Sequence, residues 1–471
     1  MDARIELSRL TADIGRAFKT WRKDNGQPSP FEGLQLFRQA LLEEATTPHE
    51  ATNKILFELL KNLKQVDQEG AELLSRRFFD TEKMRAIANS LNMSEATAFR
   101  RQNEAVGRSA ALLQAKEIEA RRQRQAVLEQ RLERATYTQL IGAEAHLNRL
   151  VEVLTTVEAP WLVAIEGLGG IGKTSLAGAI ARQMIEQRWG QEIGWVSARQ
   201  HIFTLDGQLQ PVEVPALTTA SLVERLIAQL LPQLPAPERL SALEAKTLLR
   251  THLAQRRALI VIDNLETVQD VQELLPTLRE LANPAKFLLT SRESYYHEPA
   301  LYHFPLPELT EADTLRLIRH EIEAHNLTHL HRANDDDLRQ VYQVVGGNPL
   351  ALRLVVGQTH VFSLADILED LRRARSQTVD EVYTFIYRRA WDALAEPARR
   401  LFVAMLLVTD EGEGLDDLAE LSTLEVGTVR VALKQLVDLN LVNSSGDHQR
   451  RHYSLHNLTR AFLHEQVLKW Q

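Results

Sequence analysis

One short segment limits the folds open to this chain more than any other. Residues Gly167–Thr174 contain four glycines and end in lysine and threonine, which fits the pattern G-x-x-x-x-G-K-[S/T]. The apolar run Leu162–Glu166 precedes this segment, and the helix-forming sequence Ser175–Ile185 follows it. A strand, a glycine-rich turn and a helix in this order predict a phosphate-binding loop at the edge of a parallel sheet.

The residue types of this loop suit a nucleotide polyphosphate. Glycine lets the backbone fold around phosphate oxygens with its N–H groups pointing inward. We expect Lys173 to reach the β- and γ-phosphates, Thr174 to coordinate Mg²⁺, and Ser175 to lie at the α-phosphate. A glycine-rich turn with a solvated lysine is the alternative, and the flanking strand and helix argue against it. The expected nucleotide-binding residues of the loop are Gly167, Gly169, Gly170, Gly172, Lys173, Thr174 and Ser175.

A carboxylate ends a second apolar run, Ala258–Asp263. A buried carboxylate is costly unless it is compensated, and beside a phosphate-binding loop the natural compensator is Mg²⁺. We therefore expect Asp263 to be a metal ligand. The next residue, Asn264, has an amide that cannot take a proton from water. Glu266 is the candidate for polarising the attacking water, with an acid at a helix N-terminus as an equal alternative.

A third apolar run, Lys286–Ser291, is followed by Arg292. In a phosphate-binding sheet this strand end lies beside the γ-phosphate, where a guanidinium can distinguish ATP from ADP. The alternative is an arginine on the surface at the end of a strand. The expected catalytic residues are Lys173, Asp263, Glu266 and Arg292.

The order of helical and apolar segments predicts a multidomain protein of the α and α/β classes. Strands are expected at 162–166, 193–198, 258–263 and 286–291, separated by helices, which favours a buried parallel sheet. We expect five segments: a helical N-terminal module over 1–108 with a helix-turn-helix at about 73–113, a connecting helix over 109–135, a P-loop nucleotide-binding domain over 136–308, a helical domain over 309–375, and a winged-helix domain over 376–471.

Composition excludes several classes of protein. The chain has no cysteine, so disulfides, thiolate nucleophiles and cysteine-based zinc sites are excluded. No apolar run approaches the roughly 18 residues that a membrane-spanning helix needs, and no signal peptide is apparent at the N-terminus. We therefore expect a cytoplasmic protein.

These motifs, in this order, resemble the STAND class of P-loop ATPases and, within it, the NB-ARC family, over about residues 138–468. Ile141, Gly142 and Glu144 match the entry motif of that family, while Ala143 stands where arginine is usual. The resemblance implies that Gly142 lies at the nucleotide and that Arg292 is the residue that senses its phosphates.

Two further motifs support the resemblance. Gly347–Pro349 matches the GxP motif of the family's helical domain, which implies that Pro349 packs against adenine. His456 matches the histidine of the MHD motif, which implies a contact with the β-phosphate of ADP in a closed state. Asn457 stands where the family usually has aspartate.

The segment Leu73–Leu113 resembles the helix-turn-helix of sigma-factor region 4. Residues 1–135 carry 23 basic and 20 acidic residues against 32 and 43 in the remainder, a weak indication of a polyanion-binding module. A helical adaptor or oligomerisation bundle with a charged face is the alternative. The expected DNA contacts are Arg100, Arg101, Gln102, Asn103 and Arg108.

Together these features predict a slow, Mg²⁺-dependent ATPase that acts as an ATP/ADP switch. The resemblance implies that ADP holds the helical and winged-helix domains closed, and that exchange for ATP opens the chain for self-association in signal transduction, transcriptional regulation or defence. The expected partners are nucleotide, further copies of the chain and DNA. No interaction with a membrane is expected. The sensor repeats usual in the family are missing, so we expect a separate sensor protein or a ligand that acts directly on the ATPase core. The alternatives are an AAA+-like DNA-loading or transposition ATPase and a protein-binding adaptor ATPase.

Overall fold

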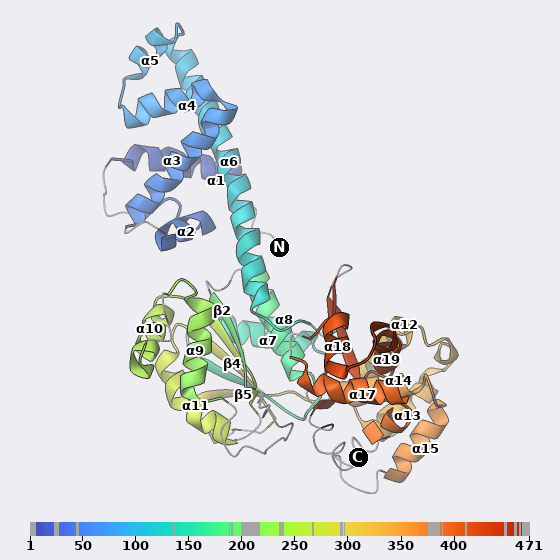
Figure 1. Cartoon of the computed structure of the whole chain (residues 1–471). Coiled ribbons are helices and arrows are strands. Elements are labelled where there is room, and N and C mark those ends of the chain that lie inside the picture. Colours follow the sequence, from blue (N-terminus) through green and yellow to red (C-terminus); the bar gives the residue numbers. More distant parts are fainter. Residues whose placement is uncertain are drawn as a thin grey trace. The chain divides into compact units, whose positions relative to one another are not determined.

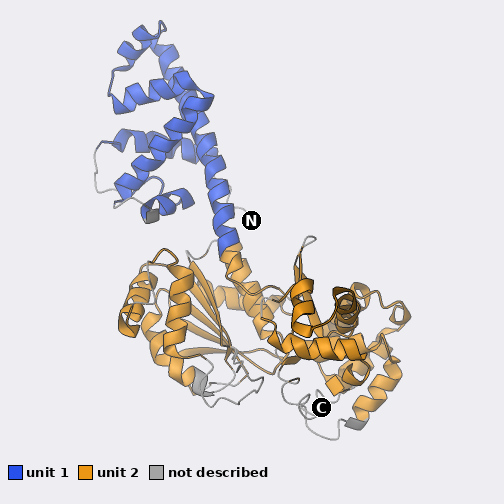
Figure 2. Cartoon of the chain, in the orientation of Figure 1, with its two compact units in different colours: residues 1–127 blue, residues 128–471 orange. Residues whose placement is uncertain are grey.

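The computed structural model divides the chain into two compact units, residues 1–127 and 128–471 (Figure 2). The residues that the structure describes are 6–22, 28–43, 47–135, 137–187, 189, 192–198, 217–234, 240–265, 268–292, 295, 297–374, 387–388, 390–409, 412–446, 450–455, 459–460 and 463. None of the helices in these ranges is long and apolar enough to cross a membrane.

The first unit is helical, as the sequence predicts (Figure 1). Its helices are α1 (Leu7–Thr20), α2 (Gln35–Glu43), α3 (Pro48–Val66), α4 (Gln68–Leu74), a π-helical turn (Ser75–Phe79), α5 (Met84–Ser90) and α6 (Glu95–Gln130). Apolar side chains of α1, α2, α3 and α6 form its core, in which Ile14, Leu56 and Leu63 are fully buried. The apolar face of each helix thereby leaves water, the main favourable term in folding.

In the segment where the sequence predicts a helix-turn-helix, α5 is joined by a short turn to the start of α6. Met84, Ile87 and Ala88 of α5 are buried against Ala98, in a small core separate from that of the other helices. The Oγ atom of Ser94 accepts a hydrogen bond from the backbone N–H of Thr97 at 3.1 Å, which caps α6.

The helix expected over 109–135 is largely present, as the second part of α6. The second helix of the helix-turn-helix does not end at Leu113 but continues to Gln130 as part of α6. The sequence after Leu113 is rich in Ala, Glu, Gln and Arg and contains no proline or glycine before residue 142. These residues favour the helical conformation, so nothing in the sequence interrupts α6 at that point.

The second unit contains a five-stranded parallel sheet in the order β2-β3-β4-β1-β5. Its strands are β1 (Leu162–Glu166), β2 (Glu192–Ser197), β3 (Ala258–Leu265), β4 (Lys286–Ser291) and β5 (Leu301–Pro305). The first four strands were expected, and the fold class of a parallel P-loop sheet with helical segments is confirmed. The edge strand β5 was not predicted, because Tyr302, His303 and Phe304 are only half-buried and lack an apolar run.

Helices cover both faces of this sheet. On one face α7 (Glu144–Thr155) and α8 (Lys173–Glu186) pack against the sheet, and on the other lie α9 (Thr219–Leu230), α10 (Ala242–Ala254) and α11 (Val268–Leu281). All residues of β1 are buried, as expected of a central parallel strand with both faces covered. The loop from β1 to α8 is therefore held between two rigid elements.

The remaining segment is helical and ends in a hairpin. Its elements are α12 (Glu311–Ala324), α13 (Asp335–Val345), α14 (Pro349–Gln358), α15 (Leu364–Ala374), α17 (Glu396–Ala404), α18 (Leu415–Ser422), α19 (Val426–Asp438), β6 (Val442–Gly446) and β7 (Arg451–Leu455). Buried residues from α12 to β7 form a single hydrophobic cluster. The expected helical and winged-helix segments thus share one core.

Candidate functional site

The glycine-rich loop adopts a backbone that only glycine accepts readily. Gly167, Gly170 and Gly172 have φ values of 150°, 75° and 101°. A Cβ atom at Gly167 would lie 2.9 Å from the carbonyl oxygen of Leu306, and one at Gly170 would lie 2.8 Å from Leu350 Cβ. Gly172 directly precedes α8, whose free N–H groups face the loop. This cradle fits the phosphate chain predicted from the sequence.

Lys173 is folded back over the loop. Its Nζ atom donates hydrogen bonds to the carbonyl oxygens of Gly167 at 2.6 Å and Leu168 at 2.8 Å. The ammonium group therefore lies at the mouth of the loop, where it can act as a point charge for phosphate oxygens.

The carboxylate of Asp263 joins three elements of the site. Asp263 is fully buried, and its Oδ1 atom accepts hydrogen bonds from Thr174 Oγ1 at 2.8 Å and Thr290 Oγ1 at 2.6 Å. The structure thus brings together the two predicted metal ligands, Thr174 and Asp263. A hydroxyl and a carboxylate are the hard oxygen donors that suit Mg²⁺.

Thr290 is a site residue that the sequence analysis missed. Besides its bond to Asp263, its Oγ1 atom accepts a hydrogen bond from the backbone N–H of Asn264 at 2.8 Å. This threonine therefore fixes both the carboxylate and the chain that follows it. A hydroxyl directly after the apolar residues Phe287–Leu289 was the signal in the sequence.

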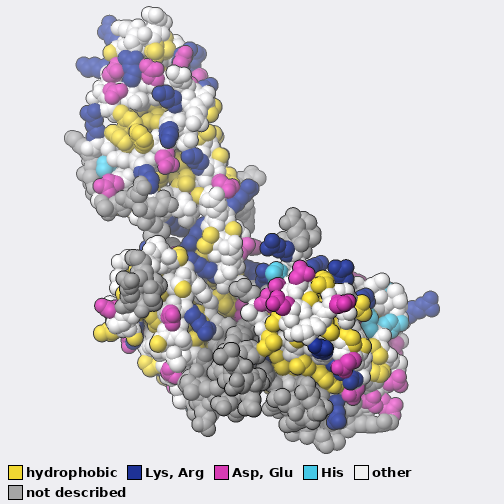
Figure 3. Space-filling view, in the orientation of Figure 1, with side chains coloured by type: hydrophobic (Ala, Val, Ile, Leu, Met, Phe, Trp, Pro, Cys, Tyr) yellow, Lys and Arg dark blue, Asp and Glu magenta, His cyan; other side chains and the backbone are white. Residues whose placement is uncertain are grey.

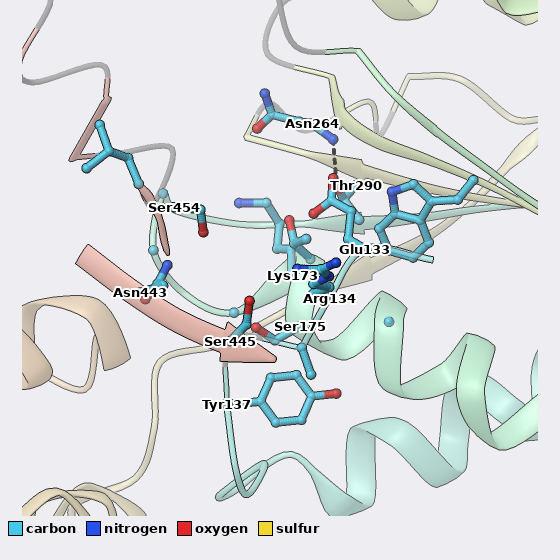
Figure 4. A pocket seen from close by; sticks show the side chains of 18 of the residues that line it. Glu133, Arg134, Tyr137, Lys173, Ser175, Asn264, Thr290, Asn443, Ser445 and Ser454 are labelled. Atoms are coloured by element: carbon cyan, nitrogen blue, oxygen red, sulfur yellow. Dashed lines mark hydrogen bonds between the residues drawn. The ribbon is translucent and has the colours of Figure 1, made fainter. Parts of the chain in front are cut away.

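Two adjoining hollows surround the loop. Over the loop lies a pocket lined by Lys173, Thr174, Ser175 and Arg292 (Figure 4). Beside it is a cavity of about 780 Å³, lined by Gly142 and Pro349 among others. The residues that line both hollows are Ala135, Tyr137, Gly170, Gly172, Ser175 and Ser445. The pair has the form of a phosphate pocket that leads into a larger nucleoside cavity.

The helical segment contacts the loop directly through Asn348, which the sequence analysis did not single out. Asn348 is 2 % exposed, and its Nδ2 atom donates to the carbonyl oxygen of Gly169 at 2.9 Å. Its Oδ1 atom accepts from the backbone N–H groups of Leu350 and Ala351 at 3.1 and 3.4 Å, which caps α14. One side chain therefore fixes the start of α14 against the phosphate-binding loop.

The hairpin β6–β7 also reaches this site. Asn443, Ser445, Ser454 and Leu455 line the pocket over the loop, and Figure 4 shows the first three beside the P-loop residues. Polar side chains from a segment far along the chain thus complete the wall of the pocket. In the sequence, the signal for this position was the resemblance of the residues directly after β7 to the MHD motif.

Some of the residues singled out from the sequence lie outside the described ranges. Glu266, the candidate for activating water, and His456 and Asn457 of the MHD-like motif are among them. Their roles remain predictions from the sequence.

The predicted DNA-contacting face carries paired charges. Arg101 forms an ion pair with Glu69, and Arg108 Nη1 lies 2.6 Å from Asp67 Oδ2. Arg100 and Asn103 are exposed, whereas Gln102 is half-buried. Figure 3 shows basic side chains interspersed with acidic ones on the visible face of this unit. Arg100 Nε also lies 3.8 Å from Glu104 Oε1, so all three arginines have acidic partners.

In a comparison with known protein families, residues 143–300 match the model of the NB-ARC domain. Regulatory protein AfsR of Streptomyces griseus is 27% identical over 344 residues, which cover 70% of this chain and 32% of that protein. Probable disease resistance RPP8-like protein 2 of Arabidopsis thaliana is 23% identical over 244 residues, which cover 50% of this chain and 24% of that protein. The chain spans about a third or less of the length of these curated relatives.

Among solved structures, a similar one is a Signal Transduction ATPase with Numerous Domains (STAND) protein with a tetratricopeptide repeat sensor from Pyrococcus horikoshii. Its TM-score is 0.47 at 17% identity, and the match covers 71% of this chain and 43% of that chain.

Proposed function

Because residues 143–300 are an NB-ARC domain of the P-loop ATPases, we propose that this chain is an ATP/ADP-dependent molecular switch. The loop Gly167–Thr174 binds the phosphates, and Lys173 supplies a mobile positive charge to the β- and γ-phosphates. Arg292, which lines the same pocket, detects the γ-phosphate. The nucleoside occupies the adjoining cavity between Gly142 and Pro349.

Thr174 and Asp263 hold Mg²⁺ together with oxygens of the nucleotide. No cluster of three or more His, Asp or Glu side chains that could hold a metal occurs within the described ranges. The remaining ligands would therefore come from phosphate and water, which is common for Mg²⁺. When bound at Thr174 and Asp263, Mg²⁺ would supply positive charge beside the phosphates.

The observation that carries the switch is the hydrogen bond from Asn348 to the carbonyl oxygen of Gly169. Through it the helical segment contacts the same loop that binds the phosphates, and the hairpin β6–β7 lines the same pocket. A ligand in the pocket would therefore contact all three segments at once. With ADP bound these segments stay closed, with His456 on the β-phosphate, and exchange for ATP separates them and allows self-association.

The N-terminal unit is the output module, and duplex DNA is its proposed target through Arg100 and Asn103. Protein binding is the second candidate. The ion pairs of Arg100, Arg101 and Arg108 with acidic residues favour it, since they leave less charge for phosphates.

Sedimentation velocity of the full chain tests the switch. With Mg²⁺ and ADP we expect a single slow species, and with Mg²⁺ and a non-hydrolysable ATP analogue a faster, concentration-dependent one. Equal sedimentation with both nucleotides, at concentrations that saturate the site, would exclude nucleotide-controlled self-association.

A further inference from the structure

The segment between α6 and the sheet also reaches the phosphate pocket. Glu133, Arg134, Ala135 and Tyr137 line it together with Lys173 and Ser175, and Figure 4 draws Arg134 among these side chains. This segment lies before the matched NB-ARC region, which begins at residue 143. None of the phosphate-binding residues expected from the sequence lies in it.

Arg134 differs from the other cationic side chains that line this pocket. Lys173 donates to two carbonyl oxygens of its own loop. Arg182 donates a hydrogen bond to the carbonyl oxygen of Glu133 and forms another with the side chain of Tyr137. Burial raises the pKa of the Tyr137 hydroxyl, although the positive charge of Arg182 acts in the opposite direction. Arg134 is exposed and makes no hydrogen bond or ion pair with any residue in the described part of the chain. Its guanidinium is therefore available to a ligand.

The charge of the pocket favours an anion. Its cationic lining residues are Arg134, Lys173, Arg182 and Arg292, and its acidic lining residue is Glu133. Guanidinium groups bind phosphate oxygens through paired, directional hydrogen bonds. A polyphosphate is the ligand chemistry that suits this set.

The backbone next to Arg134 is well anchored. Leu128 and Leu132 are buried in the core that contains β1 and α8. Between them, Arg131 Nη1 donates to Glu192 Oε2 and to the carbonyl oxygen of Ile193, both at 2.9 Å, and both charged side chains are about nine-tenths buried. Only the side chain of Arg134 would have to be ordered on binding, so the entropic cost is small.

We propose that Arg134 binds the phosphate chain of the nucleotide and thereby makes residues 131–135, directly after α6, an element that responds to the bound nucleotide. This inference rests on the proposed nucleotide-binding function. The contact acts on phosphate alone, so its effect grows with the number of phosphates on the ligand.

Equilibrium titration of the full chain with a fluorescent ATP analogue tests the proposal. Arg134→Ala should weaken binding about tenfold, the effect of losing one charge-assisted hydrogen bond at a partly exposed site. Arg134→Lys should restore part of the affinity, because it keeps the charge without the planar group. Arg332→Ala removes an exposed arginine elsewhere in the same unit and should bind like the parent chain. ATP affinity of Arg134→Ala within twofold of the parent chain would overturn the proposal.

Two further readouts separate ligand contact from a structural role. The loss should be smaller for ADP than for ATP and smallest for AMP, and the thermal unfolding midpoint without nucleotide should be unchanged. An equal loss for all three ligands, or a lowered midpoint, would also overturn the proposal. If the parent chain and Arg332→Ala bind no nucleotide at all, it is the proposed function that fails.

Discussion

The phosphate site and the predicted DNA-contacting face differ in the burial of their charged side chains. At the phosphate site, Asp263 is fully buried and its oxygen is held by two threonine hydroxyls. On α6, exposed arginines form ion pairs with acidic residues at the surface. A buried carboxylate is costly and needs a reason, whereas a surface ion pair contributes little to stability. The first arrangement therefore indicates a ligand, and the second is equally compatible with an ordinary protein surface.

The largest effect is expected at the phosphate site. Lys173→Ala should weaken ATP and ADP binding at least about 100-fold, because the phosphates lose their mobile cation. Lys61→Ala removes an exposed lysine from α3 and serves as the control. Normal ADP affinity of Lys173→Ala by calorimetry would refute the assignment of the phosphate-binding loop.

A change at Thr290 tests how much its buried hydrogen bonds to Asp263 and Asn264 contribute to stability. Thr290→Val keeps the shape but leaves the N–H of Asn264 without its acceptor and removes a donor to Asp263. We expect a loss of about 1–3 kcal/mol in unfolding free energy and weaker Mg²⁺-dependent ATP binding. Thr247→Val removes a hydroxyl on the exposed side of α10 and should cost far less. Equal losses in the two variants, by urea denaturation, would contradict the difference between buried and exposed sites.

Asn348 tests the contact between the helical segment and the loop. Asn348→Asp keeps an oxygen to cap α14 but loses the donor to the carbonyl oxygen of Gly169. A lost neutral hydrogen bond is worth about 0.5–1.5 kcal/mol, so ADP should dissociate roughly 2- to 10-fold faster. Asn348→Ser also keeps a capping oxygen and avoids the new negative charge. Unchanged ADP dissociation in both variants would show that this contact does not retain the nucleotide.

The helix-turn-helix face is tested by changing its charges in the full chain. Arg100→Ala with Arg101→Ala should weaken duplex DNA binding a few-fold and reduce the slope of log K against log salt by up to about 1.8. Glu69→Gln should strengthen binding, because it frees Arg101 from its partner. If the parent chain does not bind DNA at low salt, protein binding becomes the output to pursue.

A buried lysine at the other end of the sheet should affect stability and not nucleotide binding. Burial lowers the pKa of Lys286 from 10.5 to about 8, while its Nζ donates to the carbonyl oxygen of Pro160 at 2.8 Å. Between these pKa values the unfolded chain binds more protons, so stability should rise as the pH increases from about 8 to 10.5. Denaturation with urea across this range should show the rise in the parent chain, and a smaller rise in Lys286→Met. ATP affinity should not follow this change.

Local patterns were enough to predict the bounds of β1 and β4 and the position of the glycine-rich loop between a strand and a helix. Each depends on residues close together in the sequence, with the apolar runs and glycines that such elements require. Thr290 and Asn348 were not predicted because their partners lie far away along the chain. Asn348 and its partner Gly169 are 179 residues apart in the sequence, and Thr290 and its partner Asp263 are 27 residues apart. Such pairs follow from the order of the strands and the packing of α14, which no local pattern encodes.

The central claim is that the nucleotide controls the contact between the sheet domain and the segments that close on it. The chain has no cysteine, so Val157→Cys and Val431→Cys provide two unique labelling sites, both on exposed side chains. Fluorescence energy transfer between these labels should be high with Mg²⁺ and ADP and fall when a non-hydrolysable ATP analogue replaces ADP. With Lys173→Ala added, neither nucleotide should change the transfer. Identical transfer efficiency with saturating ADP and ATP analogue in the labelled parent chain would contradict the account.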